Sequence, residues 1–176
     1  KYTPVTNASF GVSGGSDTHT YAMSLNYYDS DSFYDVGGWE RITARIANDF
    51  KFSDKVSAGI TLNPRFETWG SPSNWADFDK IDPITPIYKP ADQLDGTENE
   101  YSIYARSPSY VWNPVATVSR FDDNTDQYNL NTNGYLQYEP IKGLIIRTQG
   151  SIEVGNRVQS IFRPDFVIDA AHEKAE

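Results

Sequence analysis

The chain has 176 residues, a formal net charge of −9 and no cysteine, which excludes disulfide bonds and thiolate metal sites from this sequence. Its fifteen basic residues are dispersed, whereas a nucleic-acid surface needs a clustered positive patch, so we expect no nucleic-acid partner. No run of about eighteen apolar residues is present for a transmembrane helix. These observations do not exclude a transmembrane β-barrel. The strands of such a barrel are only half apolar, so a hydropathy average over the sequence does not detect them.

The N-terminal part of the sequence alternates between apolar and polar side chains. A period of two indicates β-strands that have one apolar and one polar face. Within the third strand Ile42 and Ile46 lie on the apolar face, where Asn48 is the one misfit. Short turns at 14–18 and 53–54 join the strands into two hairpins. The predicted strands cover about residues 5–14, 19–30, 39–52 and 55–68.

A third hairpin repeats the pattern further along the chain. Its strands are predicted at about residues 126–139 and 143–157, around a turn at 140–143. The connection that precedes it, about residues 69–124, is far longer than any of the turns. A structureless connection of that length argues against a compact soluble domain, but it is typical of the extracellular loops of outer-membrane barrels.

Strand length and aromatic placement favour a membrane barrel over a soluble β-sandwich, the more frequent setting for alternating strands. The strands run roughly ten to fourteen residues, and about nine to eleven suffice to cross the hydrocarbon layer. Aromatic side chains gather near both strand ends, as in the interfacial girdles of barrels. They are Tyr27, Tyr28, Phe33, Tyr34 and Trp39 at one level, and Phe50, Phe52 and Tyr138 at the other. The sequence therefore predicts an all-β fold, an antiparallel transmembrane β-barrel segment of about six long strands.

Several stretches of the chain match one known family in the same order, beginning with NASFGVSGGS (7–16) and TYAMSLNYY (20–28). These two stretches resemble a recurrent hairpin of SusC/RagA-type TonB-dependent transporters, in which a strand ending in SGG precedes an aromatic-rich strand. The next hairpin of the family is similar to RITARIANDFKF (41–52) with VSAGI (56–60), and YLQYEPIKGL (135–144) is similar to its later turn. WNPVA in the long connection is similar to an "NP" segment of the family. The matches span nearly the whole chain.

The resemblance implies a bacterial outer-membrane barrel of about twenty-two strands with an N-terminal plug. It implies import of oligosaccharides or peptides in Bacteroidota, beside a SusD-like lipoprotein lid and with energy delivered by TonB through the plug. Transport of this kind is not enzymatic, and the resemblance implies no obligatory cofactor, although members of the family can bind Ca²⁺. Because neither a plug nor a signal peptide is recognisable, we expect the sequence to be an internal portion of a larger transporter.

Two alternatives stay open. A soluble β-sandwich carbohydrate-binding module would fold alone in buffer and bind glycan through the aromatic residues of the long connection. A passive porin or adhesin barrel would have no plug and no energy requirement. Whether the ligand is a glycan or a peptide is not decided by the loop composition.

Aromatic residues of the long connection are the candidate substrate-binding groups. Sugar rings stack their C–H faces on flat aromatic rings, and peptide ligands can use the same concave surfaces. The alternative is that these rings pack the loop on itself or against a lid protein, where Tyr and Trp are also favoured. The candidates are Trp69, Trp75, Tyr101, Tyr104, Tyr110 and Trp112.

Charged residues on the polar faces of the strands are expected to point into the barrel lumen, since charge on the lipid side is costly near the middle of the bilayer. Their mixed signs favour cross-strand pairing or contact with a plug. The predicted lumen-facing residues are Arg45, Asp49, Arg65, Glu67, Arg147 and Glu153.

No catalytic constellation stands out. His19 is interpreted as a solvated residue beside a turn, and His172 stands alone. The stretch Asp122–Asp126 is rich in oxygen ligands but lacks the full pattern of a calcium loop, so a solvated loop end is the favoured interpretation and no metal site is predicted.

Overall fold

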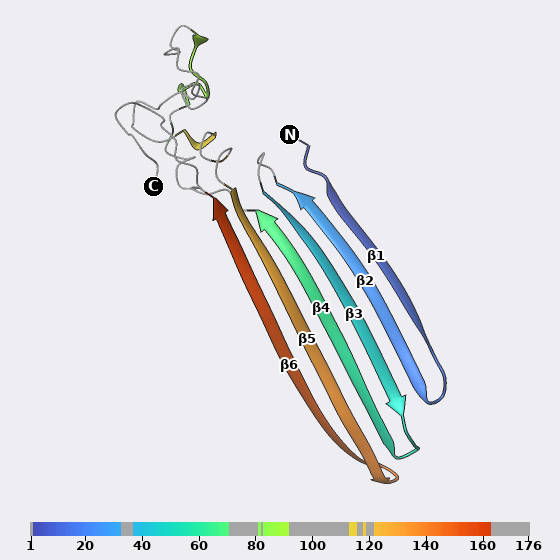
Figure 1. Ribbon diagram of the computed structural model, residues 1–176. Coiled ribbons are helices and arrows are strands. Elements are labelled where there is room, and N and C mark those ends of the chain that lie inside the picture. Colours follow the sequence, from blue (N-terminus) through green and yellow to red (C-terminus); the bar gives the residue numbers. More distant parts are fainter. Residues whose placement is uncertain are drawn as a thin grey trace. The chain divides into compact units, whose positions relative to one another are not determined.

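The computed structural model describes residues 2–32, 37–70, 81, 83–91, 113–115, 118 and 122–162. Most of the described residues belong to six long strands joined into one sheet (Figure 1). The strands are β1 (Val5–Gly15), β2 (His19–Asp31), β3 (Gly38–Lys51), β4 (Val56–Gly70), β5 (Asp122–Ile141) and β6 (Leu144–Phe162).

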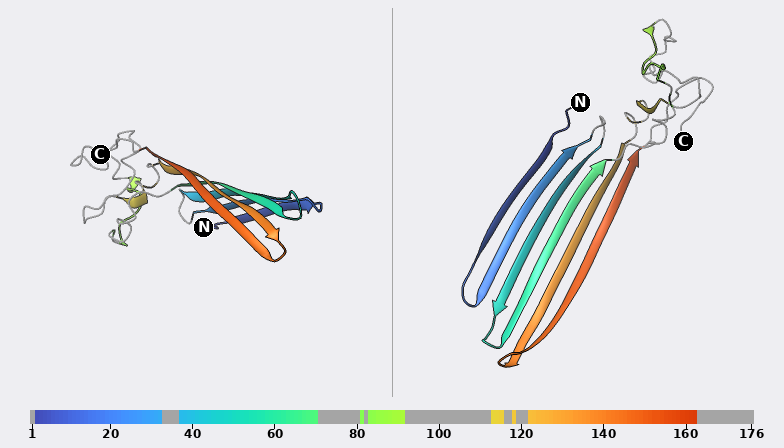
Figure 2. Two further views of the ribbon diagram at one scale, coloured as in Figure 1. Left: turned by 90° about the horizontal axis from the view of Figure 1, so that it is seen from below. Right: turned by 180° about the vertical axis from the view of Figure 1, so that it is seen from behind.

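The sheet is an antiparallel meander in which every strand lies beside its neighbour in the sequence, in the order β1-β2-β3-β4-β5-β6. The turns β1–β2, β3–β4 and β5–β6 all lie at one end of the sheet, and the longer connections leave from the other end, as both views of Figure 2 show. The strands contain 11 to 20 residues, against about five or six in ordinary soluble sheets. Six long antiparallel strands in one sheet confirm the predicted fold class.

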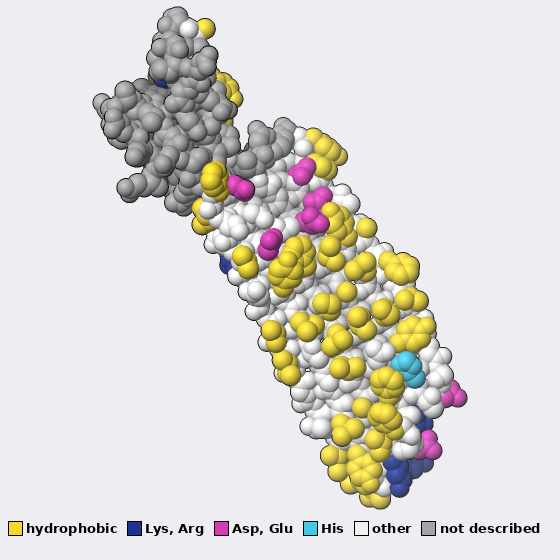
Figure 3. Space-filling model, in the orientation of Figure 1, with side chains coloured by type: hydrophobic (Ala, Val, Ile, Leu, Met, Phe, Trp, Pro, Cys, Tyr) yellow, Lys and Arg dark blue, Asp and Glu magenta, His cyan; other side chains and the backbone are white. Residues whose placement is uncertain are grey.

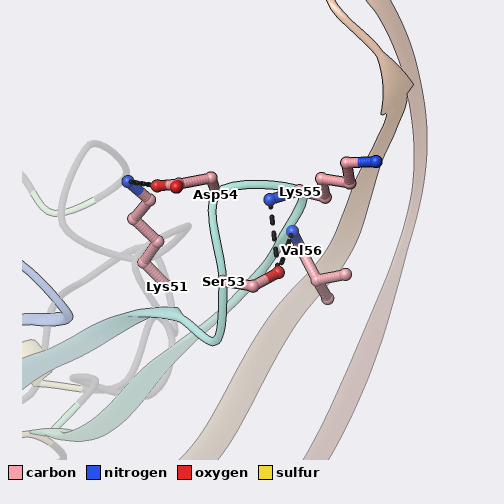
Figure 4. A network of polar contacts seen from close by, with 5 residues as sticks. All are labelled: Lys51, Ser53, Asp54, Lys55 and Val56. Carbon is pink, nitrogen blue, oxygen red and sulfur yellow. Dashed lines mark hydrogen bonds and ion pairs between the residues drawn. The ribbon is translucent and has the colours of Figure 1, made fainter.

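The turn between β3 and β4 is held by side chains (Figure 4). The Ser53 hydroxyl accepts hydrogen bonds from the backbone N–H groups of Lys55 and Val56, both at 3.2 Å, which closes the reversal locally. Lys51 Nζ lies 2.8 Å from Asp54 Oδ1, and both side chains are exposed. The Lys51 ammonium holds the pKa of the Asp54 carboxyl below its usual value, chiefly by the hydrogen bond it donates.

The turn between β5 and β6 depends on a glycine. Gly143 has a φ of 89°, in the left-handed region that side chains disfavour, and its N–H donates to Glu139 Oε1 at 2.8 Å. Gly143 is the glycine of the YEPIKGL motif, so this motif determines the left-handed backbone conformation of the turn.

The pairing register separates an apolar from a polar face across the sheet. Ala8, Tyr27 and Ile42 form one cross-strand row on the apolar face. The neighbouring row, Ser9–Asn26–Thr43, lies on the opposite face, because successive side chains alternate in a strand. Most hydrophobic side chains of the apolar face therefore lie beside others of their kind, although Asp29 and Glu40 are on the same face, near Tyr27.

The apolar face has no layer packed against it among the described residues. Phe10 is 71% exposed, Ile152 67% and Ile146 57%. Val118, which lies outside the sheet, is the one described hydrophobic side chain that is buried. Figure 3 shows hydrophobic side chains spread over this face, with acidic side chains mainly towards the end of the long connections, and basic side chains together with some acidic ones at the end of the short turns.

The long connection between β4 and β5 was expected to begin at residue 69 and to end at 124, and both limits are corrected. β4 continues to Gly70, so Trp69 belongs to a strand. β5 begins at Asp122, so the acidic stretch that was interpreted as a solvated loop end is the first part of a strand. There Asp123 Oδ1 accepts a hydrogen bond from Gln159 Nε2 of β6 at 2.8 Å, within the ladder region of the sheet.

Candidate functional site

The polar face of the sheet forms a shallow pocket that is rich in amide side chains. It has a volume of about 420 Å³. Three of the predicted charged residues, Arg45, Arg65 and Glu153, contribute to it from three different strands. The other polar residues that line it are Ser24, Asn26, Thr43, Asn63, Asn129 and Asn131.

A second pocket on the same face, of about 530 Å³, lies closer to the short turns. Asp49 and Arg147 line it from β3 and β6, with Tyr135 of β5 between them. The Tyr135 hydroxyl donates a 2.7 Å hydrogen bond to Asp49 Oδ1, and the Arg147 guanidinium lies 3.9 Å from the centre of the Tyr135 ring. One side chain of β5 thus connects a carboxylate two strands away with an arginine on the next strand.

The contact between Tyr135 and Asp49 passes over Gly59 of β4. A Cβ atom at Gly59 would collide with Asp49 Oδ1 and with the Tyr135 ring. Only a residue without a side chain leaves room for this crossing. Gly59 is therefore part of the site, although the sequence pattern did not single it out.

Arg65 and Glu67, the remaining predicted pair, interact with each other. Arg65 Nε lies 3.3 Å from Glu67 Oε2, and Glu67 is among the few buried polar side chains in the described part of the chain. All six predicted charged residues share the polar face. Arg65 pairs with a residue of its own strand rather than across strands as expected, whereas Asp49 is engaged from β5 by a tyrosine that the prediction did not name.

Trp69, the one described member of the predicted aromatic group, lies on the polar face near the end of β4. The guanidinium of Arg157 from β6 lies 5.2 Å from its ring centre, a cation–π distance. The other five members, Trp75, Tyr101, Tyr104, Tyr110 and Trp112, lie outside the described residues.

A second arginine–aromatic cluster was missed by the sequence prediction. The Arg41 guanidinium lies 5.4 Å from the centre of the Tyr28 ring and 4.9 Å from that of Trp39, and the two rings are 5.3 Å apart. Tyr28 and Arg41 are direct partners in the β2–β3 register. Both rings had been interpreted as interfacial girdle residues, but they lie on the polar face. The alternation in the sequence indicates this face, because Tyr28 is at an even position of β2 and Trp39 at an odd position of β3, as are the polar side chains of those strands.

His19 corrects a further prediction. It is the first residue of β2 and is half-buried rather than a freely solvated turn residue. Its ring stacks on Phe50 at 4.5 Å, and Nε2 lies 3.2 Å from Asn48 Oδ1. Asn48, the misfit of the apolar face, thus finds its polar partner in the adjacent strand.

Within the described residues outside the sheet, Asn113 is the most buried polar side chain. Its amide donates to the Ile87 carbonyl at 2.8 Å and its oxygen accepts from the Val115 N–H at 3.0 Å. The Asn-Pro pair of the long connection therefore has a structural role as a local anchor.

No described helix is long and apolar enough to cross a membrane. No described group of three or more His, Asp or Glu side chains is arranged to hold a metal ion.

Comparison with known proteins adds one relative. The chain is 27% identical over 161 residues to the TonB-dependent receptor P26 of Formosa agariphila. The aligned region covers 90% of this chain and 16% of that receptor. The chain thus spans about a sixth of the length of this curated relative. No family model matches the chain. The similarity supports assignment to the TonB-dependent receptor family without resolving a subtype, and the sheet of six long antiparallel strands is consistent with a portion of the β-barrel of such a receptor.

Proposed function

We propose that the chain forms part of the barrel wall of a SusC-like, TonB-dependent importer in the bacterial outer membrane. Its apolar face contacts lipid and its polar face lines the lumen. The imported ligands are oligosaccharides or peptides, a SusD-like lipoprotein covers the extracellular end, and TonB acts through a plug. The function is transport and requires no covalent chemistry.

The observation that carries this proposal is the exposed apolar face of a single-layer sheet. Each apolar Å² removed from water contributes roughly 25 cal/mol, so side chains such as Phe10, Ile146 and Ile152 strongly favour a non-aqueous neighbour. A water-soluble sandwich would provide that neighbour as a second sheet. The described residues contain none, and acyl chains would serve the same purpose in a membrane.

The shape of the apolar face agrees with lipid contact. It contains a shallow hollow of about 420 Å³ with an almost entirely apolar lining, to which Ile42, Phe66, Leu130 and Val154 contribute from four strands. Acyl chains are flexible enough to fill such a hollow. An aqueous lumen would leave it unfilled by any apolar group.

The distribution of charge supports the same orientation. The arginines and carboxylates of the two pockets lie on one face, where water or polar ligand groups can solvate them. An arginine on the lipid face near the bilayer centre would cost roughly 2–4 kcal/mol. The longer connections leave the sheet at the end opposite to the short turns, the arrangement expected when the turns are periplasmic and the loops extracellular.

The transport function is tested in cells that express the full-length receptor. Growth is measured on a panel of oligosaccharides and peptides as sole carbon source, with the receptor gene deleted and restored, and separately with TonB depleted. We expect growth on one ligand class to depend on both proteins, and a SusD-like lipoprotein to co-purify with the receptor. Growth that is unchanged on every ligand after receptor deletion would contradict an importer. Dependence on the receptor but not on TonB would favour a passive porin.

A further inference from the structure

Two arginines are stacked on aromatic rings at the end of the polar face from which the long connections leave. Arg41 lies over Tyr28 and Trp39, and Arg157 lies over Trp69. We call these clusters the entrance stacks. Trp39 remains 37% exposed, so part of its ring is available to a ligand.

Within the part of the chain that the structure describes, no carboxylate neutralises either guanidinium of the entrance stacks. Among the described residues Arg41 and Arg157 form no ion pair, in contrast to Arg65, which pairs with Glu67. The Arg41 Nε atom is buried without a hydrogen-bond partner in this part of the chain. The rings, rather than carboxylates, therefore hold the two side chains in place.

A guanidinium stacked on a ring keeps its donor groups for another partner. The stacking fixes its plane, and the outer N–H groups then present the fork that matches a carboxylate or sulfate in a bidentate contact. Arginine also loses less conformational freedom when its plane is already fixed. The geometry is thus suited to recognition of an oxyanion.

The excess of positive charge on the polar face also favours recognition of an oxyanion. The pockets and stacks contain more positive than negative side chains, although the whole chain has a net charge of −9. The acidic residues Asp29 and Glu40, paired directly in the β2–β3 register, lie on the apolar face. The positive side chains are Arg41, Arg45, Arg65, Arg147 and Arg157, against Asp49, Glu67 and Glu153.

The groups beside the stacks favour a saccharide as the bearer of the oxyanion. The pocket of about 420 Å³ contains amide side chains from three strands, Asn26, Asn63 and Asn131 among them. Amides both donate and accept hydrogen bonds, as the hydroxyl groups of a sugar require. Flat aromatic rings at the same end offer a surface for the C–H faces of sugar rings, with few placed polar groups around them.

We infer that the entrance stacks bind the carboxylate or sulfate groups of an acidic oligosaccharide. The inference rests on the proposed importer and specifies the ligand of its polar face. Arg41 and Arg157 take the oxyanions, while the asparagine-lined pocket takes hydroxyl groups.

The test uses the purified full-length receptor and calorimetric binding of matched probes. Tetragalacturonate is compared with its neutral methyl ester, and a sulfated galactan tetramer with its desulfated form, which distinguishes carboxylate from sulfate. A tetra-aspartate peptide tests the other ligand class. The variants are Arg41→Gln/Arg157→Gln and, as a control that removes positive charge at the opposite end, Lys51→Gln.

We expect at least one acidic probe to bind about tenfold or more tightly than its neutral partner, since a hydrogen-bonded charge pair contributes on this scale. The double glutamine variant should abolish this preference while leaving the affinity for the neutral probe and the heat-modifiable gel mobility of a folded barrel unchanged. Lys51→Gln should bind each probe with the affinity of the wild type. If the double glutamine variant does not fold, Arg41→Lys/Arg157→Lys retains the charge and should reduce the preference by removing the planar fork.

Equal affinities within each acidic and neutral pair, or no binding of any saccharide, would overturn the inference. An acidic preference that survives both double substitutions would also overturn it. Tighter binding of tetra-aspartate with the same arginine dependence would assign the stacks to peptides instead. None of these results alters the growth assay, so failure of the inference is distinguishable from failure of the proposed transport function.

Discussion

Gly59 is predicted to be indispensable for the contact between Tyr135 and Asp49, although it is a strand glycine with no side chain of its own. In Gly59→Ala the added methyl group would collide with Asp49 Oδ1 and the Tyr135 ring. Relief requires that both side chains move, which breaks their 2.7 Å hydrogen bond. A hydrogen bond to a carboxylate contributes about 1.5–3 kcal/mol, and the lower end applies because this contact is exposed to solvent. We expect Gly59→Ala to lower the free energy of unfolding by about 1–3 kcal/mol.

Gly150 provides the matched control. It also lies inside a long strand, but a Cβ atom there would have nothing within 4 Å. Because glycine in a strand costs roughly 0.5–1 kcal/mol relative to alanine, Gly150→Ala should be neutral or slightly stabilising. Of the two glycine-to-alanine changes, only Gly59→Ala is therefore predicted to destabilise the protein.

The assay is urea unfolding of the full-length receptor in detergent micelles, followed by tryptophan fluorescence. In a Tyr135→Ala background the ring and the hydrogen bond are already lost, so Gly59→Ala should cost less than in the wild type, an interaction that a double-mutant cycle measures directly. Equal effects of Gly59→Ala and Gly150→Ala, or an undiminished cost in the Tyr135→Ala background, would refute the reasoning.

Three further predictions concern the lipid face and the turns. Ile152→Arg should destabilise the inserted receptor by roughly 2–4 kcal/mol, whereas Ser151→Arg on the opposite face should cost far less, as measured by unfolding from lipid vesicles; equal costs would contradict the assignment of faces. Gly143→Ala should cost about 1–2 kcal/mol in the same measurement, because its φ is 89°, and a neutral effect would show that the turn relaxes. Because the pKa of Asp54 is lowered by Lys51, their contact stabilises the turn above the ordinary carboxyl pKa of 3.8 and is lost as the pH falls through the lowered value. The difference in unfolding midpoint between wild type and Lys51→Gln should then disappear in acid, and a difference independent of pH would argue against it.

Alternation of side chains was sufficient to predict the strands and their faces, because a face exposed to a uniform apolar or polar environment imposes a strict period of two. Ile42 and Ile146 are examples in which local pattern and structure agree. Strand ends were harder to place. The ladder of backbone hydrogen bonds continues through Asp122 and Trp69 irrespective of side-chain polarity, so composition suggested a loop where the structure has a strand.

Contacts between strands could be anticipated only where the register was known. The stacks of Arg41 and Arg157, and the crossing of Tyr135 over Gly59, join residues that are distant in the sequence. Tyr28 is at an even position of β2, where the polar side chains of that strand lie. The period of two, applied strictly, therefore separates Tyr28 from the aromatic residues predicted to form the interfacial girdle. The partner of Asn48 could not be predicted in the same way, because His19 had been interpreted as a solvated residue beside a turn.

Collision accessibility along β6 tests the orientation of the sheet most directly. Spin labels are attached to single cysteines at residues 144–157 of the full-length receptor in a cysteine-free background, and accessibility to oxygen and to a water-soluble nickel chelate is measured in lipid vesicles. We predict two curves of period two in opposite phase, with oxygen maxima at Ile146 and Ile152 and nickel maxima at Arg147 and Ser151. High nickel accessibility on both faces, or low accessibility to both reagents at Ile146 and Ile152 as in a packed protein core, would contradict contact of the apolar face with lipid.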